Sequence, residues 1–120
     1  MEIIKTNIDL SDKKAIYKLT KSSSEMVQNA PDGMSVPVVS WALYNDPKEA
    51  KDGTTRDNQV LSYTDSAGVK YSTVSATFIR EFLDIVDLMT GEPFAIIIRH
   101  GTSKGGKAFV TCELDCDWNG

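Results

Sequence analysis

The sequence predicts a mainly β fold that contains one helix, and three observations support this prediction. Segments rich in β-branched and aromatic residues recur along the chain, turn-forming residues separate them, and a single segment shows the apolar spacing typical of an amphipathic helix. Three predicted strands precede this helix and two follow it. That order is typical of the OB-fold, a five-stranded barrel whose helix lies between strands three and four. A small α+β sandwich is the alternative architecture.

The first three predicted strands form a meander of residues 34–44, 59–64 and 69–75. Pro37 lacks a backbone N–H, so the first strand must lie at an edge or carry a bulge at this point. Residues 45–58 are almost purely polar and are predicted to be a long flexible loop. The four residues 65–68 are predicted to be the turn of a hairpin between the second and third strands.

Residues 77–89 are predicted to be the helix, because their apolar side chains recur at a spacing of about 3.6 residues. Ser75 or Thr77 is expected to cap its start, and Gly91 its end. The last two strands are predicted at residues 94–100 and 107–114, with a glycine-rich connection between them.

The whole chain, residues 1–120, is expected to form one OB-fold domain with an N-terminal extension at 1–33 and a short acidic tail at 115–120. Within the extension, Ile3, Ile8 and Leu10 are compatible with an extra strand. Residues 25–30 are compatible with a helical turn that Ser22 or Ser23 caps.

Composition limits the class of protein. The chain has 120 residues, of which 41% are hydrophobic and 25% charged, an ordinary composition for one modest globular core. The longest apolar run, residues 94–98, is far shorter than the 20 or so residues that cross a bilayer, and no secretory signal is recognisable. We therefore expect a cytoplasmic protein without a membrane partner, in which Cys112 and Cys116 are free thiols.

The residues do not indicate an enzyme, a cofactor or a metal site. Residues 101–107 match the G-x-x-x-x-G-K pattern of a phosphate-binding loop, but Ala108 stands where that loop needs Ser or Thr, and a strand follows where it needs a helix. Cys112, Cys116 and His100 do not have the ligand number or spacing of a structural zinc site. Cys112 is better explained as a buried residue of the last strand.

Charge is unevenly distributed along the chain. The net charge is −4, which at first argues against a nucleic-acid partner. Residues 13–24 and 93–112, however, each contain basic side chains and no acidic one, whereas acids gather at 46–57, 81–92 and 113–117. A scatter of solvated charges is the simpler explanation for this pattern.

The alternation of side chains along each strand separates core aromatics from surface ones. Val39, Trp41 and Leu43 share a face and are predicted to be core. Phe109 shares the polar face of Lys107, Thr111 and Glu113. Tyr44 lies at the mouth of the polar loop, and Tyr63 and Tyr71 lie on neighbouring strands, where they are either exposed aromatics or half-buried barrel residues. Aromatic residues interleaved with Lys and Arg are typical of surfaces that bind single-stranded nucleic acid.

Four segments resemble a known family: Tyr17–Ser22, Ser40–Tyr44, Ser75–Phe82 and His100–Lys107. Together they are similar to the small single-stranded DNA-binding proteins encoded by phages, conjugative plasmids and integrative elements of Gram-positive bacteria, over about residues 17–114. The resemblance implies an OB-fold that coats single-stranded DNA during replication or transfer of the element. The short tail departs from the better-known bacterial relatives, which makes recruitment of partner enzymes through it doubtful.

The sequence therefore predicts a sequence-tolerant, non-enzymatic single-stranded DNA-binding protein. OB-folds bind oligonucleotides on the face of strands two and three and on the loops after strands one and four. The candidate binding residues are Tyr44, Tyr63, Lys70, Tyr71, Arg99, His100, Lys104, Lys107 and Phe109. The alternative is a protein-interaction or inhibitor module of a mobile element that uses the same barrel face, which a charge-poor surface around Phe109 favours. Binding of RNA and assembly into homo-oligomers remain open.

Overall fold

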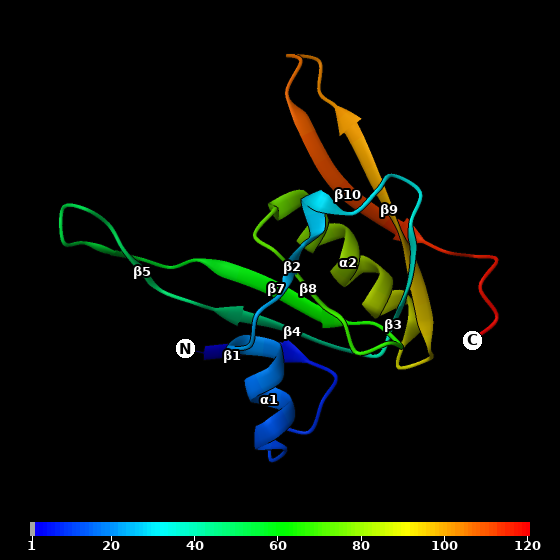
Figure 1. Ribbon diagram of the computed structural model, residues 1–120, viewed down its shortest axis with the longest axis horizontal. Helices are drawn as coiled ribbons and strands as arrows, with labels where there is room; N and C mark the ends of the chain where they lie inside the picture. Colours follow the sequence, from blue (N-terminus) through cyan, green and yellow to red (C-terminus); the bar gives the residue numbers. More distant parts are fainter. Residues whose placement is uncertain (1) are drawn as a thin grey trace.

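The computed structural model describes residues 2–120, apart from the side chains of Lys48 and Arg56. Its strands form two main sheets and a separate short hairpin (Figure 1). In chain order the elements are β1 (Glu2–Thr6), α1 (Lys13–Thr20), β2 (Glu25–Met26), the 3₁₀ helix η1 (Val27–Asn29), β3 (Ser35–Val38), β4 (Ser40–Asn45), β5 (Lys48–Glu49), β6 (Thr55–Arg56), β7 (Gln59–Thr64), β8 (Lys70–Thr73), α2 (Ala76–Met89), β9 (Phe94–Thr102) and β10 (Ala108–Leu114). The mainly β prediction is confirmed. The prediction of a single helix is wrong, because α1 and η1 accompany α2.

The two sheets share one stretch of chain. The larger sheet has the order β1-β4-β7-β8-β2, and the smaller has the order β10-β9-β3. The predicted strand 34–44 is divided at Val39 into β3, which pairs with β9, and β4, which pairs with β7. The predicted hairpin of residues 59–64 and 69–75 is present as the antiparallel pair β7 and β8. One continuous segment thus crosses from the smaller sheet into the larger one.

The predicted closed barrel is not formed by the described residues. Strands β8 and β10 are not hydrogen-bonded neighbours in either sheet, so a seam remains between them. The 3₁₀ helix η1 contacts both strands at this seam, and β2 pairs with β8 in parallel on the edge where β10 would close a barrel. The N-terminal extension therefore occupies the position that barrel closure requires.

Helix α2 begins and ends close to the predicted residues. The Ser75 hydroxyl accepts a hydrogen bond from the Phe78 backbone N–H at 3.3 Å, as an N-cap does. At the other end Thr90 has the left-handed conformation, with φ of 47°, and Gly91 follows with φ of 89°. The buried side of the helix packs between the sheets through the residues Phe78, Ile79, Phe82 and Ile85.

Helix α1 was not expected from the sequence. The Asp12 carboxylate caps it by accepting a hydrogen bond from the Ala15 backbone N–H at 3.1 Å. Leu19 is its one fully buried residue, and it packs with Ala42, Tyr44 and Val60 on the face of the larger sheet that is turned away from α2. The larger sheet is therefore covered on both faces, by α2 on one and by α1 on the other.

Two other predictions for polar segments need correction. The helical turn predicted within residues 25–30 is present as η1, directly after β2, but neither Ser22 nor Ser23 caps it, because the N-cap residue is Met26 and it makes no side-chain cap bond. Within the predicted loop 45–58, β5 and β6 pair as a short antiparallel hairpin. In Figure 1 this hairpin and the β9–β10 hairpin project from the body in different directions. None of the described helices has the length and apolar character needed to span a bilayer.

We predict that replacing Trp41 with Ala mainly lowers stability. Trp41 is 3% exposed and its ring meets the Phe82 ring edge-on, with centroids 5.8 Å apart, so the change leaves a cavity between β4 and α2. The expected loss is about 3–5 kcal/mol in the free energy of unfolding, measured by urea titration. Leu88→Ala, at a site that is 72% exposed, is the matched control. A Trp41→Ala protein as stable as this control would contradict the core assignment.

We also predict that the two thiols differ in reactivity. Cys112 is buried, and burial raises the pKa of its thiol to about 12, whereas Cys116 is exposed. Because the thiolate is the reactive species, Ellman's reagent should titrate Cys116 quickly in the folded protein and Cys112 only after unfolding. Equal rates for both thiols in the folded protein would show that Cys112 is accessible.

Candidate nucleic-acid interface

A groove of about 520 Å³ lies beside β10 and brings three of the predicted site residues together. His100, Lys107 and Phe109 line it from the β9–β10 hairpin, and Gln28 of η1 and Ser75 complete it from the opposite side. Ser75 follows β8, so the groove lies along the seam between the two sheets. The site is thus open where a closed barrel would have a continuous wall.

Phe109 is the aromatic side chain of this groove, and it is 42% exposed. Val110 and Cys112 face the core, so alternation along β10 turns Phe109 outward, as the sequence predicts. Phe109 lies directly across from Gly101 in the register of β9 and β10. A Cβ atom at Gly101 would lie 2.5 Å from Phe109 Cζ, so the outer end of the ring occupies the space that the glycine leaves free. The ring is therefore held against the hairpin while much of its surface remains open.

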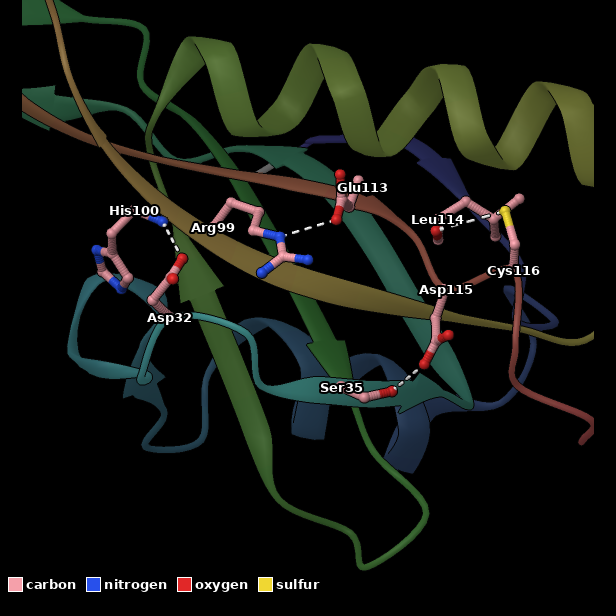
Figure 2. A network of polar contacts seen from close by, with 8 residues as sticks. All are labelled: Asp32, Ser35, Arg99, His100, Glu113, Leu114, Asp115 and Cys116. Carbon is pink, nitrogen blue, oxygen red and sulfur yellow. Dashed lines mark hydrogen bonds and ion pairs between the residues drawn. The ribbon is translucent and has the colours of Figure 1, made fainter.

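His100 is fixed by the loop that precedes β3. Its backbone N–H donates to Asp32 Oδ1 at 2.9 Å, as Figure 2 shows. Its ring Nε2 lies 2.6 Å from the Ala30 carbonyl oxygen. Because a carbonyl can only accept, Nε2 carries the hydrogen in this contact.

Arg99 is exposed but already has an acidic partner. Its Nε donates to Glu113 Oε1 across the two strands at 2.8 Å (Figure 2), and this hydrogen bond raises the pKa of Arg99. Arg99 therefore remains charged, but the carboxylate of Glu113 reduces the positive potential it offers to a phosphate.

Lys104 and Lys107 lie at the tip of the β9–β10 hairpin and are both exposed. The turn that carries them is closed by two backbone bonds, from the N–H of Ser103 to Lys107 and from the N–H of Gly106 to Ser103, each 2.9 Å long. Gly106 has a φ of 82°, a conformation that favours glycine. Neither lysine takes part in an ion pair within the described part of the chain. The hairpin tip is therefore a local positive patch.

Tyr44 and Lys70 lie beneath the N-terminal segment rather than at the surface. Tyr44 is 5% exposed, its hydroxyl is 3.2 Å from the Ser62 hydroxyl, and burial raises its pKa. Lys70 is 6% exposed, its Nζ donates to the Ser22 carbonyl at 2.7 Å, and burial lowers its pKa. Helix α1 and the residues that follow it cover both side chains, so the outward placement expected for them is not found.

Tyr63 and Tyr71 face each other across β7 and β8, but they point into the core. The Tyr63 ring is 0% exposed and stacks between Tyr71, at 5.4 Å, and the rings of α2, among them Phe82 at 5.6 Å. These two tyrosines are therefore buried residues and not exposed aromatics. The core prediction is confirmed for Trp41 and Leu43 but is wrong for Val39, which is 58% exposed and lies between β3 and β4, where the chain passes from one sheet to the other. Of the predicted aromatic residues, Phe109 alone is exposed among the described residues.

Sequence reasoning missed Gln28 and gave Ser75 only a capping role. Both residues reach the groove through tertiary packing, Gln28 through the contacts of η1 with β8 and β10. No local pattern marks these residues as part of a groove, because they come close to β10 only in the folded chain.

A larger hollow of about 650 Å³ has a different chemical character. It lies near the junction of β3 and β4, where Val39, Phe94 and Trp118 are among its lining residues. Its lysine, Lys5, is paired with Asp87 at 2.8 Å, so this hollow lacks the free positive charge of the hairpin groove. Within the described part of the chain, no cluster of His, Cys, Asp and Glu residues is suited to hold a metal ion.

Comparison with known families identifies one match. The model of the family described as Phage Single-stranded DNA-binding protein matches residues 1–115. Comparisons with curated proteins and with solved structures gave no match. The family match covers both sheets, both helices and the hairpin groove. The chain therefore belongs to the phage single-stranded DNA-binding protein family.

Proposed function

We propose that this protein binds single-stranded DNA, with little preference for sequence, in the groove and at the tip of the β9–β10 hairpin. The observation that carries the proposal is the Phe109 ring, held across Gly101 and flanked in one groove by His100 and Lys107. Family membership supports single-stranded DNA as the partner. An aromatic ring with nearby cations is the combination that binds unpaired bases and the backbone that joins them.

In this proposal, a base stacks on the open surface of Phe109, and Lys104 and Lys107 contact the phosphates on either side. Stacking uses the π-face that every base has, and phosphate contacts carry no sequence information, so binding tolerates any sequence. Duplex DNA binds less well because its bases already stack on one another. His100 lines the same groove through a ring that Ala30 holds in place.

The other predicted residues have supporting roles in this proposal. Tyr63 and Tyr71 hold β7 and β8 against α2, and Tyr44 and Lys70 hold the N-terminal segment on the larger sheet. Arg99 adds positive potential beside the groove, although Glu113 reduces it. We further propose that the chain is one domain of the OB type that is open between β8 and β10. The connections of its strands and the position of α2 between β8 and β9 support this.

The proposed setting is the coating of single strands while the genome of a phage or related mobile element is copied or transferred in the host cytoplasm. The protein acts there by binding and not by catalysis. The alternative, a protein-interaction or inhibitor module, requires a charge-poor surface around Phe109. The basic residues beside Phe109 favour nucleic acid.

We predict that oligo-dT binding weakens with salt and that Lys104→Ala, Lys107→Ala reduces this dependence. Each phosphate contact on a single strand contributes about 0.7 to the slope of log K against log salt concentration. The loss of two contacts should therefore lower the magnitude of this slope by roughly 1 to 1.5. The measurement is fluorescence anisotropy at several salt concentrations, with duplex DNA and RNA of the same length beside oligo-dT. Lys5→Ala, Arg80→Ala removes two exposed, ion-paired charges and is the matched control. A parent protein that binds duplex as tightly as oligo-dT would overturn the proposed function.

We predict that Phe109→Ala weakens oligo-dT binding by about 1–3 kcal/mol, the value of one lost base stack. Stability should change little, because Phe109 is 42% exposed. Gly101→Ala should also weaken binding, since its Cβ would displace the ring from the position it occupies. Leu88→Ala removes an exposed apolar residue of α2 and should bind like the parent. If Phe109→Ala binds like the parent but unfolds at lower urea, Phe109 is structural.

A further inference from the structure

Helix α1 presents an exposed stripe that the proposed site does not use. Lys14, Tyr17, Lys18 and Lys21 are all exposed, and their spacing of i, i+3, i+4 and i+7 places them on one side of the helix. The opposite side carries Leu19, which packs on the larger sheet. The sheet therefore fixes the orientation of this stripe toward solvent.

Tyr17 is the most exposed aromatic residue of the described chain, at 63%. Phe109 is the other exposed aromatic residue in the described part, and the remaining ones are buried except for the half-buried Trp118. Both exposed rings thus lie among lysines. Because most of the Tyr17 side chain is exposed, its ring has surface on which a base can stack.

The positive charge of the stripe has no acidic partner among the described side chains. Residues 13–24 contain no Asp or Glu, and no ion pair of the described residues involves the stripe lysines. The Lys18 ammonium reaches toward the turn between β7 and β8, 3.6 Å from the position of a Cβ at Gly68. The positive potential of α1 therefore extends over the edge of the larger sheet and is complementary to a polyanion.

The chain itself connects this stripe to the hairpin groove. After α1, β2 pairs with β8, then Gln28 of η1 lines the groove, and the Ala30 carbonyl accepts the bond from His100. Figure 1 shows β2 and η1 between α1 and the β9–β10 hairpin. A strand that leaves the groove along this segment arrives at α1.

We propose that α1 is a second contact surface for the same DNA strand, with Tyr17 stacking on a base and the stripe lysines contacting phosphates. This inference rests on the proposed function, because it extends the strand that the hairpin groove holds. It makes the bound length depend on α1: a short oligonucleotide fills the groove alone, and a longer one reaches both surfaces.

The test compares oligo-dT of about 4 and about 16 nucleotides, the limits of the range for one OB-fold. Tyr17→Ala should weaken binding of the long strand by about 5- to 150-fold, the equivalent of one base stack, and leave the short strand unchanged. Tyr17→Phe keeps the ring and should retain binding of the long strand. Lys14→Gln, Lys18→Gln should lower the salt slope for the long strand by about 1.4 in magnitude, as two phosphate contacts predict. Urea titration of each variant checks that the fold is intact.

The matched control for the lysine pair is Lys5→Gln, Arg80→Gln, which changes the net charge equally at exposed sites outside both surfaces. If the α1 variants bind the long strand with the affinity and salt slope of this control while the hairpin variants are weakened, the inference is wrong and the proposed function stands. If the parent shows no preference for single strands, the proposed function itself fails. Weakening of the short strand by Tyr17→Ala would also overturn the inference, because it would place Tyr17 in the groove.

Discussion

The contacts of the Phe82 ring hold the two sheets in one relative position. Its centroid lies 5.8 Å from that of Trp41 in β4, 5.6 Å from that of Tyr63 in β7 and 5.9 Å from that of Phe94 in β9. The first two strands belong to the larger sheet and the third to the smaller one. Because no backbone hydrogen bonds join β8 to β10 among the described residues, side-chain packing through α2 provides the cohesion that a closed barrel obtains from pairing. The β9–β10 hairpin extends from this packing, so the geometry of the groove depends on a buried ring outside it.

Local sequence patterns predicted the elements that have one buried face and one exposed face. The 3.6-residue period identified α2, and alternation identified the outward side of Phe109 in β10, since in both cases one face meets the core. Trp41 was correctly predicted to be core, but residues 41–44 of β4 are all buried, so alternation did not distinguish the two faces of this strand. Tyr63 could not be placed in this way. Residues 60–64 of β7 are all buried, because α1 covers the face that α2 does not, and alternation cannot show that a second layer is present. Helix α1 was missed because it spans only eight residues, fewer than the roughly 11–18 residues over which helical periodicity is judged.

The N-terminal segment explains why the groove lies where it does. In OB-folds, oligonucleotides generally bind on the outer face of strands two and three. In this chain α1 packs on the face of the larger sheet that is turned away from α2, and residues 22–26 follow the edge of that sheet, with the Ser22 carbonyl bonded to Lys70 and β2 paired with β8. The surface left open is the seam beside β10 and the hairpin that rises from it. The N-terminal segment that covers one face of the larger sheet also supplies Gln28 to the groove, which the pattern of strands alone does not predict.

The narrow shape of the molecule bears on how an acidic protein meets an acidic polymer. The chain carries a net charge of −4, yet its shortest dimension is 24 Å. At physiological ionic strength the influence of an exposed charge decays over about 8 Å, a fraction of that thickness. A strand beside the hairpin tip therefore responds to Lys104 and Lys107 within reach, while acids more than a screening length away contribute little to the potential there. At lower salt concentration the influence of each charge extends further. The net charge of the protein therefore governs its approach to DNA only in dilute salt.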